Sequence, residues 1–161
     1  MNLLQFEIPE NEPALFDTWP LADQRDAGSV TDVDLYYRLF LVRARFVASG
    51  VEFISPTGTV TLFSLASSAV GSVLRLRDGL SGGLGLPESP EVIEFRPDGA
   101  EVVIRSSLLP LTAVVGRTEL IACLIAFVNE AHRAIVSHWA ALAENEDVAG
   151  LKKDVAEFEI G

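Results

Sequence analysis

"PEVIEFRPDGAEVVIRSS", residues Pro90–Ser107, is the stretch that decides the fold class of this chain. Two runs rich in β-branched and aromatic residues lie on either side of the segment Pro97–Ala100. Such runs around an Asp-Gly pair are typical of a β-hairpin, because glycine adopts the backbone angles that a tight turn requires. We therefore expect antiparallel β-structure at the centre of the chain.

The side chains of this hairpin also predict its register. If Arg96 faces Glu101, then Phe95 lies opposite Val102, and apolar residues meet along one face of both strands. That register requires a four-residue loop, or a tighter turn at Asp98-Gly99. We expect the hairpin to pair in this way.

Two segments have the apolar periodicity of helices. Between Ser64 and Leu80, apolar residues recur at intervals of three and four, which predicts a helix over about residues 64–79. After Thr118, a residue type favoured at the N-cap, a similar apolar stripe continues to about Ala143. It predicts a second helix over about residues 118–142.

The segment Val33–Val47, "VDLYYRLFLVRARFV", is rich in aromatic and β-branched residues and predicts a strand. Its apolar residues change face near Phe40, so we expect a β-bulge, a bend or burial of both faces there. Further strands are expected at Leu3–Ile8 and Val51–Ser55, and a turn then leads into a short apolar piece, Thr59–Leu62. The predicted fold is α+β: a curved antiparallel sheet of about five to six strands, including the 90–107 hairpin, packed against the two helices.

The length of the chain predicts one domain. Its 161 residues are the size of an ordinary single domain, so residues 1–161 are expected to share one core. Residues 1–32 are acidic and interrupted by prolines, which predicts an irregular N-terminal arm. Residues 144–161 are expected to form a short helix or a tail, docked by Leu151, Val155 and Phe158.

Several features favour a cytoplasmic location. The single cysteine, Cys123, excludes an intramolecular disulfide and fits a reducing compartment. The N-terminus lacks the basic and long apolar regions of a secretory signal. Residues Phe53–Leu74 carry no charge and are long enough to span a membrane, but they include Pro56, Gly58 and many serines and threonines. We interpret them as a strand, a turn and a helix, not as a membrane span.

Acidic residues are concentrated at the N-terminus. The formal net charge is −11, and residues 1–34 carry eight acids against Arg25 alone. Nucleic acid and anionic membranes require a basic surface, so this balance argues against both as partners. It favours a basic protein partner, since complementary charges select partners; the alternative is that the charge serves solubility alone. The candidate partner-binding residues are Asp17, Trp19, Asp23, Asp26, Asp32, Asp34, Glu88, Glu91 and Glu94.

The segment Asp78–Glu91, "DGLSGGLGLPESPE", poses the question whether its glycines bind phosphate. A phosphate-binding loop follows a strand, ends in a lysine and precedes a helix. Here a helix is expected before the glycines, the loop has no lysine, and carboxylates follow. We therefore expect Gly79 to end the helix in a left-handed cap, with a flexible connector after it.

No other residues form a catalytic or metal-binding motif. His132 and His138 are six residues apart, so they point in different directions from one helix and cannot chelate the same metal. We expect His132 on a solvated face, His138 partly in the core, and Cys123 buried. The arginines Arg43 and Arg45 share a strand face and could bind an anion, but pairing with the acidic arm is the simpler hypothesis. The sequence predicts no enzyme activity, no cofactor and no metal.

Four stretches together are similar to a known pattern. They are "WPLAD" at Trp19–Asp23, "DVDLYYRLFL" at Asp32–Leu41, "EFRPDGAEVVI" at Glu94–Ile104 and "ELIACLIAFVNEAHRAIVSHWAAL" at Glu119–Leu142. Over roughly residues 17–151 the chain resembles uncharacterised bacterial proteins with a strand meander, a helix, a hairpin and a long C-terminal helix. That layout is similar to small acidic immunity proteins of bacterial toxin–immunity systems. The resemblance implies tight binding of a cognate toxin and carries no catalytic residue, and the N-terminal acid cluster departs from it.

Three functions are compatible with these features. The first is a non-enzymatic protein-binding domain, an immunity protein that neutralises a bacterial toxin through an acidic surface. The second is a ligand-binding or enzymatic domain with a pocket between sheet and helices, lined by Tyr36, Tyr37 or Trp139 with His138 or Arg43 as polar group. The third is an oligomeric structural module, such as a homodimer formed through the long helix.

Overall fold

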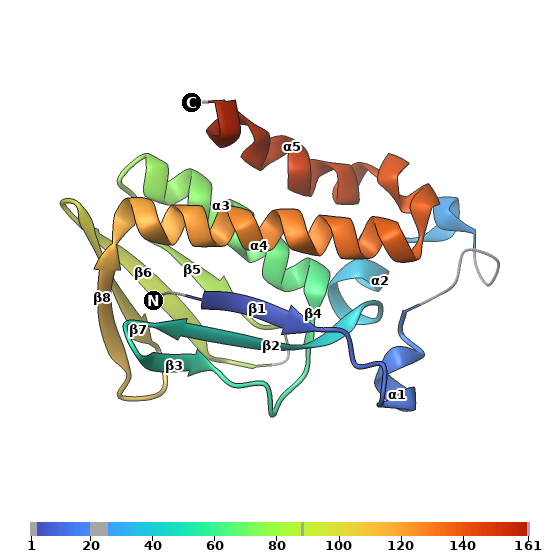
Figure 1. Ribbon diagram of the computed structural model, residues 1–161, viewed down its shortest axis with the longest axis horizontal. Coiled ribbons are helices and arrows are strands. Elements are labelled where there is room, and N and C mark those ends of the chain that lie inside the picture. The colour runs from blue at the N-terminus through green and yellow to red at the C-terminus, as the bar shows by residue number, and fades with distance from the viewer. Residues whose placement is uncertain (1–2, 20–25, 88, 161) are drawn as a thin grey trace.

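The computed structural model describes residues 3–19, 26–87 and 89–160 (Figure 1). Its helices and antiparallel strands confirm the α+β class. In chain order the elements are β1 (Leu3–Glu7), α1 (Pro13–Phe16), a 3₁₀ helix (Ala27–Ser29), α2 (Asp32–Tyr37), β2 (Leu41–Ala48), β3 (Val51–Ile54), β4 (Val60–Thr61), α3 (Leu62–Arg77), β5 (Gly82–Gly85), β6 (Val92–Asp98), β7 (Glu101–Ser106), β8 (Thr112–Gly116), α4 (Arg117–His138), a second 3₁₀ helix (Ala140–Glu144) and α5 (Glu146–Ile160).

Among the described residues, the strands form two antiparallel sheets of four strands each rather than one curved sheet. The first has the order β1-β2-β3, with β4 also pairing with β2, and the second has the order β5-β6-β7-β8. The sheets are linked through the core, where the ring centroids of Phe46 on β2 and Phe95 on β6 lie 6.1 Å apart. Pairing in the second sheet joins strands that follow one another in the chain, whereas in the first sheet β1 pairs with β2 across α1 and α2.

Helix α3 lies at the centre of the core. Ten of its 16 residues are buried, and it packs against α4, α5 and strand β5. The helix begins at Leu62, two residues before the predicted start, and ends at Arg77. Gly79 follows with a φ of +73°, which confirms the left-handed cap. Figure 1 shows α4 and α5 stacked on the same side of the molecule, away from the strand β3.

The glycine-rich segment forms a strand rather than a flexible connector. Ser72 on α3 donates a hydrogen bond to the Gly83 carbonyl (2.7 Å) and accepts one from the Gly83 N–H (2.9 Å). A Cβ at Gly82 would lie 3.0 Å from Ser72, and a Cβ at Gly83 would lie 2.8 Å from the Ile93 carbonyl oxygen. The glycines therefore allow β5 to lie directly against α3 and β6, and the prediction of a mobile loop is wrong.

The predicted strand Val33–Val47 is also wrong in its first half, which forms helix α2. Thr31 and Asp34 make a capping box: the Asp34 N–H donates to Thr31 Oγ1 (3.2 Å) and the Thr31 N–H to Asp34 Oδ2 (3.1 Å). These bonds satisfy backbone donors at the helix start and outweigh the β-propensity of the sequence. The change of face near Phe40 marks the join of helix and strand, where Phe40 is buried with a φ of +58°.

The predicted hairpin is present, with a register two residues away from the expected one. Asp98 pairs with Glu101 and Phe95 with Ile104, so the turn is the two-residue segment Gly99–Ala100, with a φ of +62° at Gly99. A register shift of two residues keeps every side chain on the same face of the hairpin, so the apolar side chains still share one face.

The C-terminal half differs from the prediction in its details. Helix α4 begins after Gly116, not at Thr118, and no side chain caps it. It ends at His138 instead of continuing to 142, because Trp139 leaves the helical conformation and its side chain enters the core. Of the two alternatives for residues 144–161, a short helix or a tail, the structure has the helix α5, with Leu151 and Val155 buried and Phe158 packed against the core.

The uncharged segment Phe53–Leu74 spans β3, β4 and most of α3, so it forms a strand, a turn and a helix as predicted. Among the described residues, α4 is the one helix that is long and apolar enough to cross a membrane by length and composition. A third of its most apolar window is buried, and Leu120, Leu124 and Val128 lie in the core. A core helix passes the same test, so this observation is weak evidence for a membrane span.

Candidate functional site

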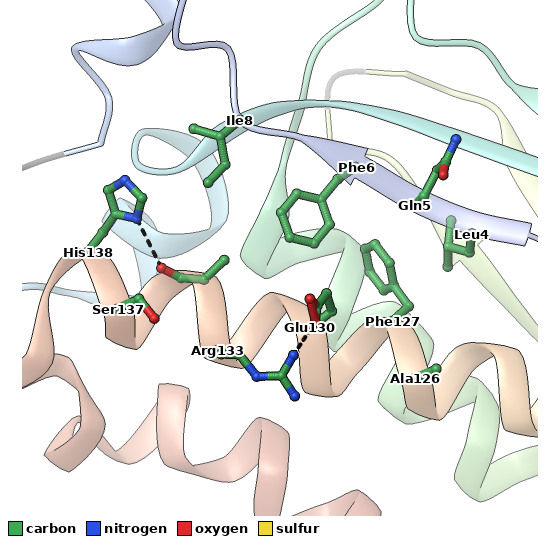
Figure 2. A pocket seen from close by; sticks show the side chains of 11 residues that line it. Leu4, Gln5, Phe6, Ile8, Ala126, Phe127, Glu130, Arg133, Ser137 and His138 are labelled. Carbon is green, nitrogen blue, oxygen red and sulfur yellow. Dashed lines mark hydrogen bonds and ion pairs between the residues drawn. The ribbon is translucent and has the colours of Figure 1, made fainter.

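The structure contains a long hollow, the β1–α4 groove, between the first strand and the long helix (Figure 2). Its volume is about 620 Å³. Leu4, Phe6 and Ile8 point from the strand side toward the helix, and the Phe6 ring meets the Phe127 ring edge-on at 5.8 Å. The groove thus has an apolar wall on the strand side.

The helix contributes a polar rim to this groove, including Glu130, Arg133, Ser137 and His138. Glu130 and Arg133 form an exposed ion pair. Nδ1 of His138 lies 3.3 Å from the Ala134 carbonyl oxygen, and the Trp19 ring packs against the imidazole at 4.8 Å. His138 is therefore half-buried, as predicted. Ser137 precedes it on the helix and points in another direction, so the two do not form a nucleophile–base pair.

A second hollow, the tyrosine cavity, has a volume of about 500 Å³. Tyr36 and Tyr37 form one wall. Tyr36 is fixed by its hydroxyl, 3.0 Å from the Ser67 hydroxyl, and by edge-on contact with Phe63 at 5.0 Å. Tyr37 is 55% exposed and its ring lies 6.4 Å from that of Tyr36. One tyrosine is rigid and the other faces solvent.

Ser106 lies behind the lining of the tyrosine cavity and holds two of its lining residues, Glu91 and Leu109. Its hydroxyl donates to Glu91 Oε2 at 2.6 Å and accepts from the N–H groups of Leu108 (3.2 Å) and Leu109 (2.9 Å). One buried serine therefore orients a carboxylate that lines the cavity and orders a turn that carries two leucines. The leucines are 60% and 52% exposed, although their backbone is held in place.

Arg43 ties a second wall, the segment 55–61, to the N-terminal arm. It donates to both carboxylate oxygens of Glu12, at 3.0 and 2.6 Å, and to the Thr57 carbonyl at 2.9 Å. Hydrogen bonding to Arg43 lowers the pKa of Glu12. Desolvation opposes this shift, and the positive charge of Arg43 adds to it. The predicted pairing of Arg43 with the acidic arm is confirmed, and Arg45 pairs instead with Glu52.

The nine candidate partner-binding residues do not form one surface. Trp19 and Asp34 are each 3% exposed; Trp19 donates its indole N–H to the Leu41 carbonyl, and Asp34 caps α2. Both are structural and are removed from the candidate interface. Glu91 lines the tyrosine cavity, and Asp23 and Glu88 lie outside the described residues. Four further carboxylates are exposed: Asp17, Asp26, Asp32 and Glu94.

The described residues contain no cluster of three or more His, Cys, Asp or Glu side chains that could hold a metal. Cys123 is half-buried. Burial raises the pKa of its thiol, the Leu4 backbone lowers it, and Glu119 raises it. A raised pKa keeps the thiol protonated at neutral pH, so it is a poor nucleophile. His132 is half-buried rather than fully solvated, and burial followed by the Lys152 charge lowers its pKa.

Some features of the tyrosine cavity were predictable and others were not. Tyr36 and Tyr37 line it, as the ligand-binding hypothesis expected, whereas Trp139 is 1% exposed and His138 belongs to the other hollow. Ser106, Leu108 and Leu109 were missed. The signal in the sequence is the run of Ser106-Ser107-Leu108-Leu109-Pro110, in which exposed leucines follow a strand and precede a proline.

Comparison with protein-family models, with curated proteins and with solved structures finds no match to this chain. The function must therefore be argued from the two hollows.

Proposed function

We propose that this protein is a non-enzymatic binding domain for a basic protein partner, and that it acts as an immunity protein against a bacterial toxin. The single observation that supports this most is the tyrosine cavity, whose lining includes Glu91 together with Tyr36 and Tyr37. A lysine or arginine of the partner enters the cavity between the carboxylate and the rings.

Each part of the cavity contributes in a way known from protein interfaces. Tyrosine rings attract a cation by about 0.5–2 kcal/mol, depending on desolvation. A hydrogen bond from a cation to a carboxylate is worth about 1.5–3 kcal/mol. Exposed apolar side chains held on an ordered turn, here Leu108 and Leu109, bury surface without a large entropic cost. The cavity is therefore suited to the central anchor of an interface.

The charge and the overall pattern of the chain support the same proposal. The formal net charge of −11 favours a basic partner and fast association. The resemblance to small acidic immunity proteins agrees with it. As part of the proposal we place the protein in the cytoplasm, where immunity proteins meet toxins made in the same cell.

The first test measures recognition of the cation itself. Acetyl-arginine methylamide is titrated into the isotope-labelled protein and followed by amide NMR. We expect saturable shifts at Tyr36, Tyr37 and Glu91, reduced about tenfold in affinity by Glu91→Gln, since loss of one charged hydrogen bond costs about 1.4 kcal/mol or more. Glu94→Gln is the matched control, since Glu94 is exposed on β6, three residues after Glu91, and does not line the cavity. Equal effects of the two substitutions would exclude Glu91 as the anchor.

The second test measures protection. The gene next to the one encoding this protein is expressed alone and together with the wild type or with Glu91→Lys. We expect growth arrest without the protein, rescue by the wild type and loss of rescue by Glu91→Lys, because the introduced lysine repels a basic anchor. Absence of growth arrest, or full rescue by a folded Glu91→Lys variant, contradicts the proposal.

A further inference from the structure

Strand β1 is an edge strand among the strands that the structure describes, since β2 is its one paired neighbour there. In an antiparallel ladder, alternate residues direct both backbone groups away from the partner strand. The Leu4 backbone hydrogen bonds to the Cys123 thiol on α4, so Leu4 is one of the outward residues and Phe6 is the next. The Leu4 group is taken by Cys123 and the Ile8 carbonyl by the Glu10 N–H, so the outer edge of β1 presents the backbone groups of Phe6 to an extended chain.

The β1–α4 groove leaves room for such a chain. Helix α4 closes the edge at Leu4, and the groove continues past Phe6 and Ile8 toward His138. The strand side from Leu4 to Ile8, one residue beyond β1, is about 13 Å long at about 3.3 Å per residue. A volume of about 620 Å³ accommodates an extended segment of similar length, so the space matches a short added strand.

The helix surface under the groove carries a regular pattern. Ala126, Glu130 and Ala134 follow one another at intervals of four residues and all line the groove. Four residues of helix rise about 6 Å, and alternate residues of a strand are about 6.7 Å apart. The inward side chains of an added strand therefore have nearly the same spacing as these three residues. Two alanines leave space for apolar side chains, with the carboxylate of Glu130 between them.

The charge of Glu130 favours a basic side chain at the position of the added strand that lies over it. Its pair with Arg133 is exposed on both sides, at 57% and 69%, and exposed ion pairs exchange at little cost. A basic side chain from the added strand can therefore take the carboxylate, with Arg133 swinging toward solvent.

We infer that the β1–α4 groove binds an extended peptide segment that adds to β1 as a new edge strand. Its inward side chains alternate apolar, basic and apolar, over Ala126, Glu130 and Ala134. This mode of recognition draws affinity from backbone hydrogen bonds and specificity from alternate side chains. The groove shares no lining residue with the tyrosine cavity, so this site stands independently of the proposed function.

The experiment uses the full-length protein and the blocked heptapeptide Thr-Val-Thr-Lys-Thr-Val-Thr, followed by amide NMR. We expect saturable shifts over residues 4–8 and 126–138, with slowed hydrogen exchange at the Phe6 amide. A peptide with Glu in place of Lys should bind about tenfold more weakly, and so should peptides N-methylated at the residues that pair with β1. A peptide N-methylated at the intervening residues, whose N–H groups point away from β1, is the control. Equal binding of the two N-methylated peptides would overturn strand addition.

Two variants of the protein complete the test. Ala126 is exposed and lines the groove, so Ala126→Arg should fill the groove and weaken peptide binding at least about tenfold. Ala122 is exposed one turn earlier on the helix and does not line the groove, so Ala122→Arg should leave peptide binding unchanged. Glu91→Gln should leave peptide binding unchanged, which separates this site from the tyrosine cavity. Shifts confined to other residues, or no saturable binding, would overturn the inference. Dimers in sedimentation that protect the Phe6 amide without peptide would assign the groove to a second copy and also overturn it.

Discussion

At the scale of single residues, the buried or tethered polar groups of this protein mainly organise structure. Arg43 joins the arm to the wall of the tyrosine cavity through Glu12 and the Thr57 carbonyl. Ser106 orients Glu91 and the leucine-bearing turn at the same time. In both cases one side chain serves several partners, so its effect on the cavity extends beyond any single hydrogen bond.

The Glu12–Arg43 pair makes stability depend on pH in a defined direction. The pKa of Glu12 is lowered from 4.5 in the folded protein, chiefly by hydrogen bonding to Arg43. A group with a depressed folded pKa stabilises the protein above its unfolded pKa, and this contribution is lost as pH falls through the folded pKa. We expect wild type to exceed Glu12→Gln in unfolding free energy near pH 7, and the difference to shrink below about pH 4.5.

Urea unfolding of both proteins between about pH 7 and about pH 3 measures this difference. Arg43→Gln should remove the same pH-dependent part, and the double variant should remove no more, because each partner acts through the other. A wild-type advantage that stays constant across the whole range would contradict the prediction.

At the scale of elements, close packing decides two segments against their local preferences. Helix α2 forms where aromatic and β-branched residues predict a strand, because the capping box of Thr31 and Asp34 nucleates the helix. Strand β5 forms where four glycines predict mobility, because Ser72 bonds both backbone groups of Gly83 and the missing side chains permit contact. In both segments a few specific hydrogen bonds outweigh propensity.

The β5–α3 contact predicts opposite outcomes for two glycines of one strand. Gly83→Ala places a Cβ 2.8 Å from the Ile93 carbonyl oxygen, a backbone atom that cannot move freely, whereas a Cβ at Gly85 meets no atom within 4 Å. We expect Gly83→Ala to destabilise the protein by about 1–3 kcal/mol. Gly85→Ala should change stability by less than about 1 kcal/mol.

Denaturant unfolding followed by circular dichroism measures both values. The two substitutions have the same chemistry and lie in the same strand, so each is the control for the other. Equal destabilisation by both would show that strand entropy, and not close approach, explains the effect.

At the scale of the whole molecule, one hydrophobic cluster joins the N-terminal arm, both sheets and the long helices. Trp19 belongs to the arm yet lies against Phe40 and His138, with ring centroids 5.0 and 4.8 Å away. Trp139 lies at the far end of α4 and is buried as well. The described part of the arm is thus integrated into the core.

The continuity of this core predicts that the arm and the C-terminal helices unfold together. The two tryptophans are labelled with 5-fluorotryptophan, which gives each its own fluorine NMR resonance without substitution. We expect both native resonances to disappear at the same denaturant concentration as the circular dichroism signal, because a shared core unfolds cooperatively. Earlier loss of the Trp19 resonance would show that the arm opens separately.

The sequence by itself determined the elements whose signals are local. Helices α3 and α4 follow from apolar periodicity, and the β6–β7 hairpin follows from alternation around Asp98 and Gly99. The left-handed cap at Gly79 follows from the same kind of local rule. These features depend on residues within one or two turns of each other, so the pattern of neighbours is sufficient to predict them.

Only the tertiary structure decided how these elements combine and which side chains remain accessible. The two sheets, the burial of Trp19 and Asp34, and the meeting of Tyr37, Glu91 and Leu109 at one cavity bring together residues that are far apart in the chain. Such contacts depend on the packing of the whole core rather than on local propensity. For that reason the composition shows that the chain is acidic. It does not show that Glu91 lines a cavity with two tyrosines.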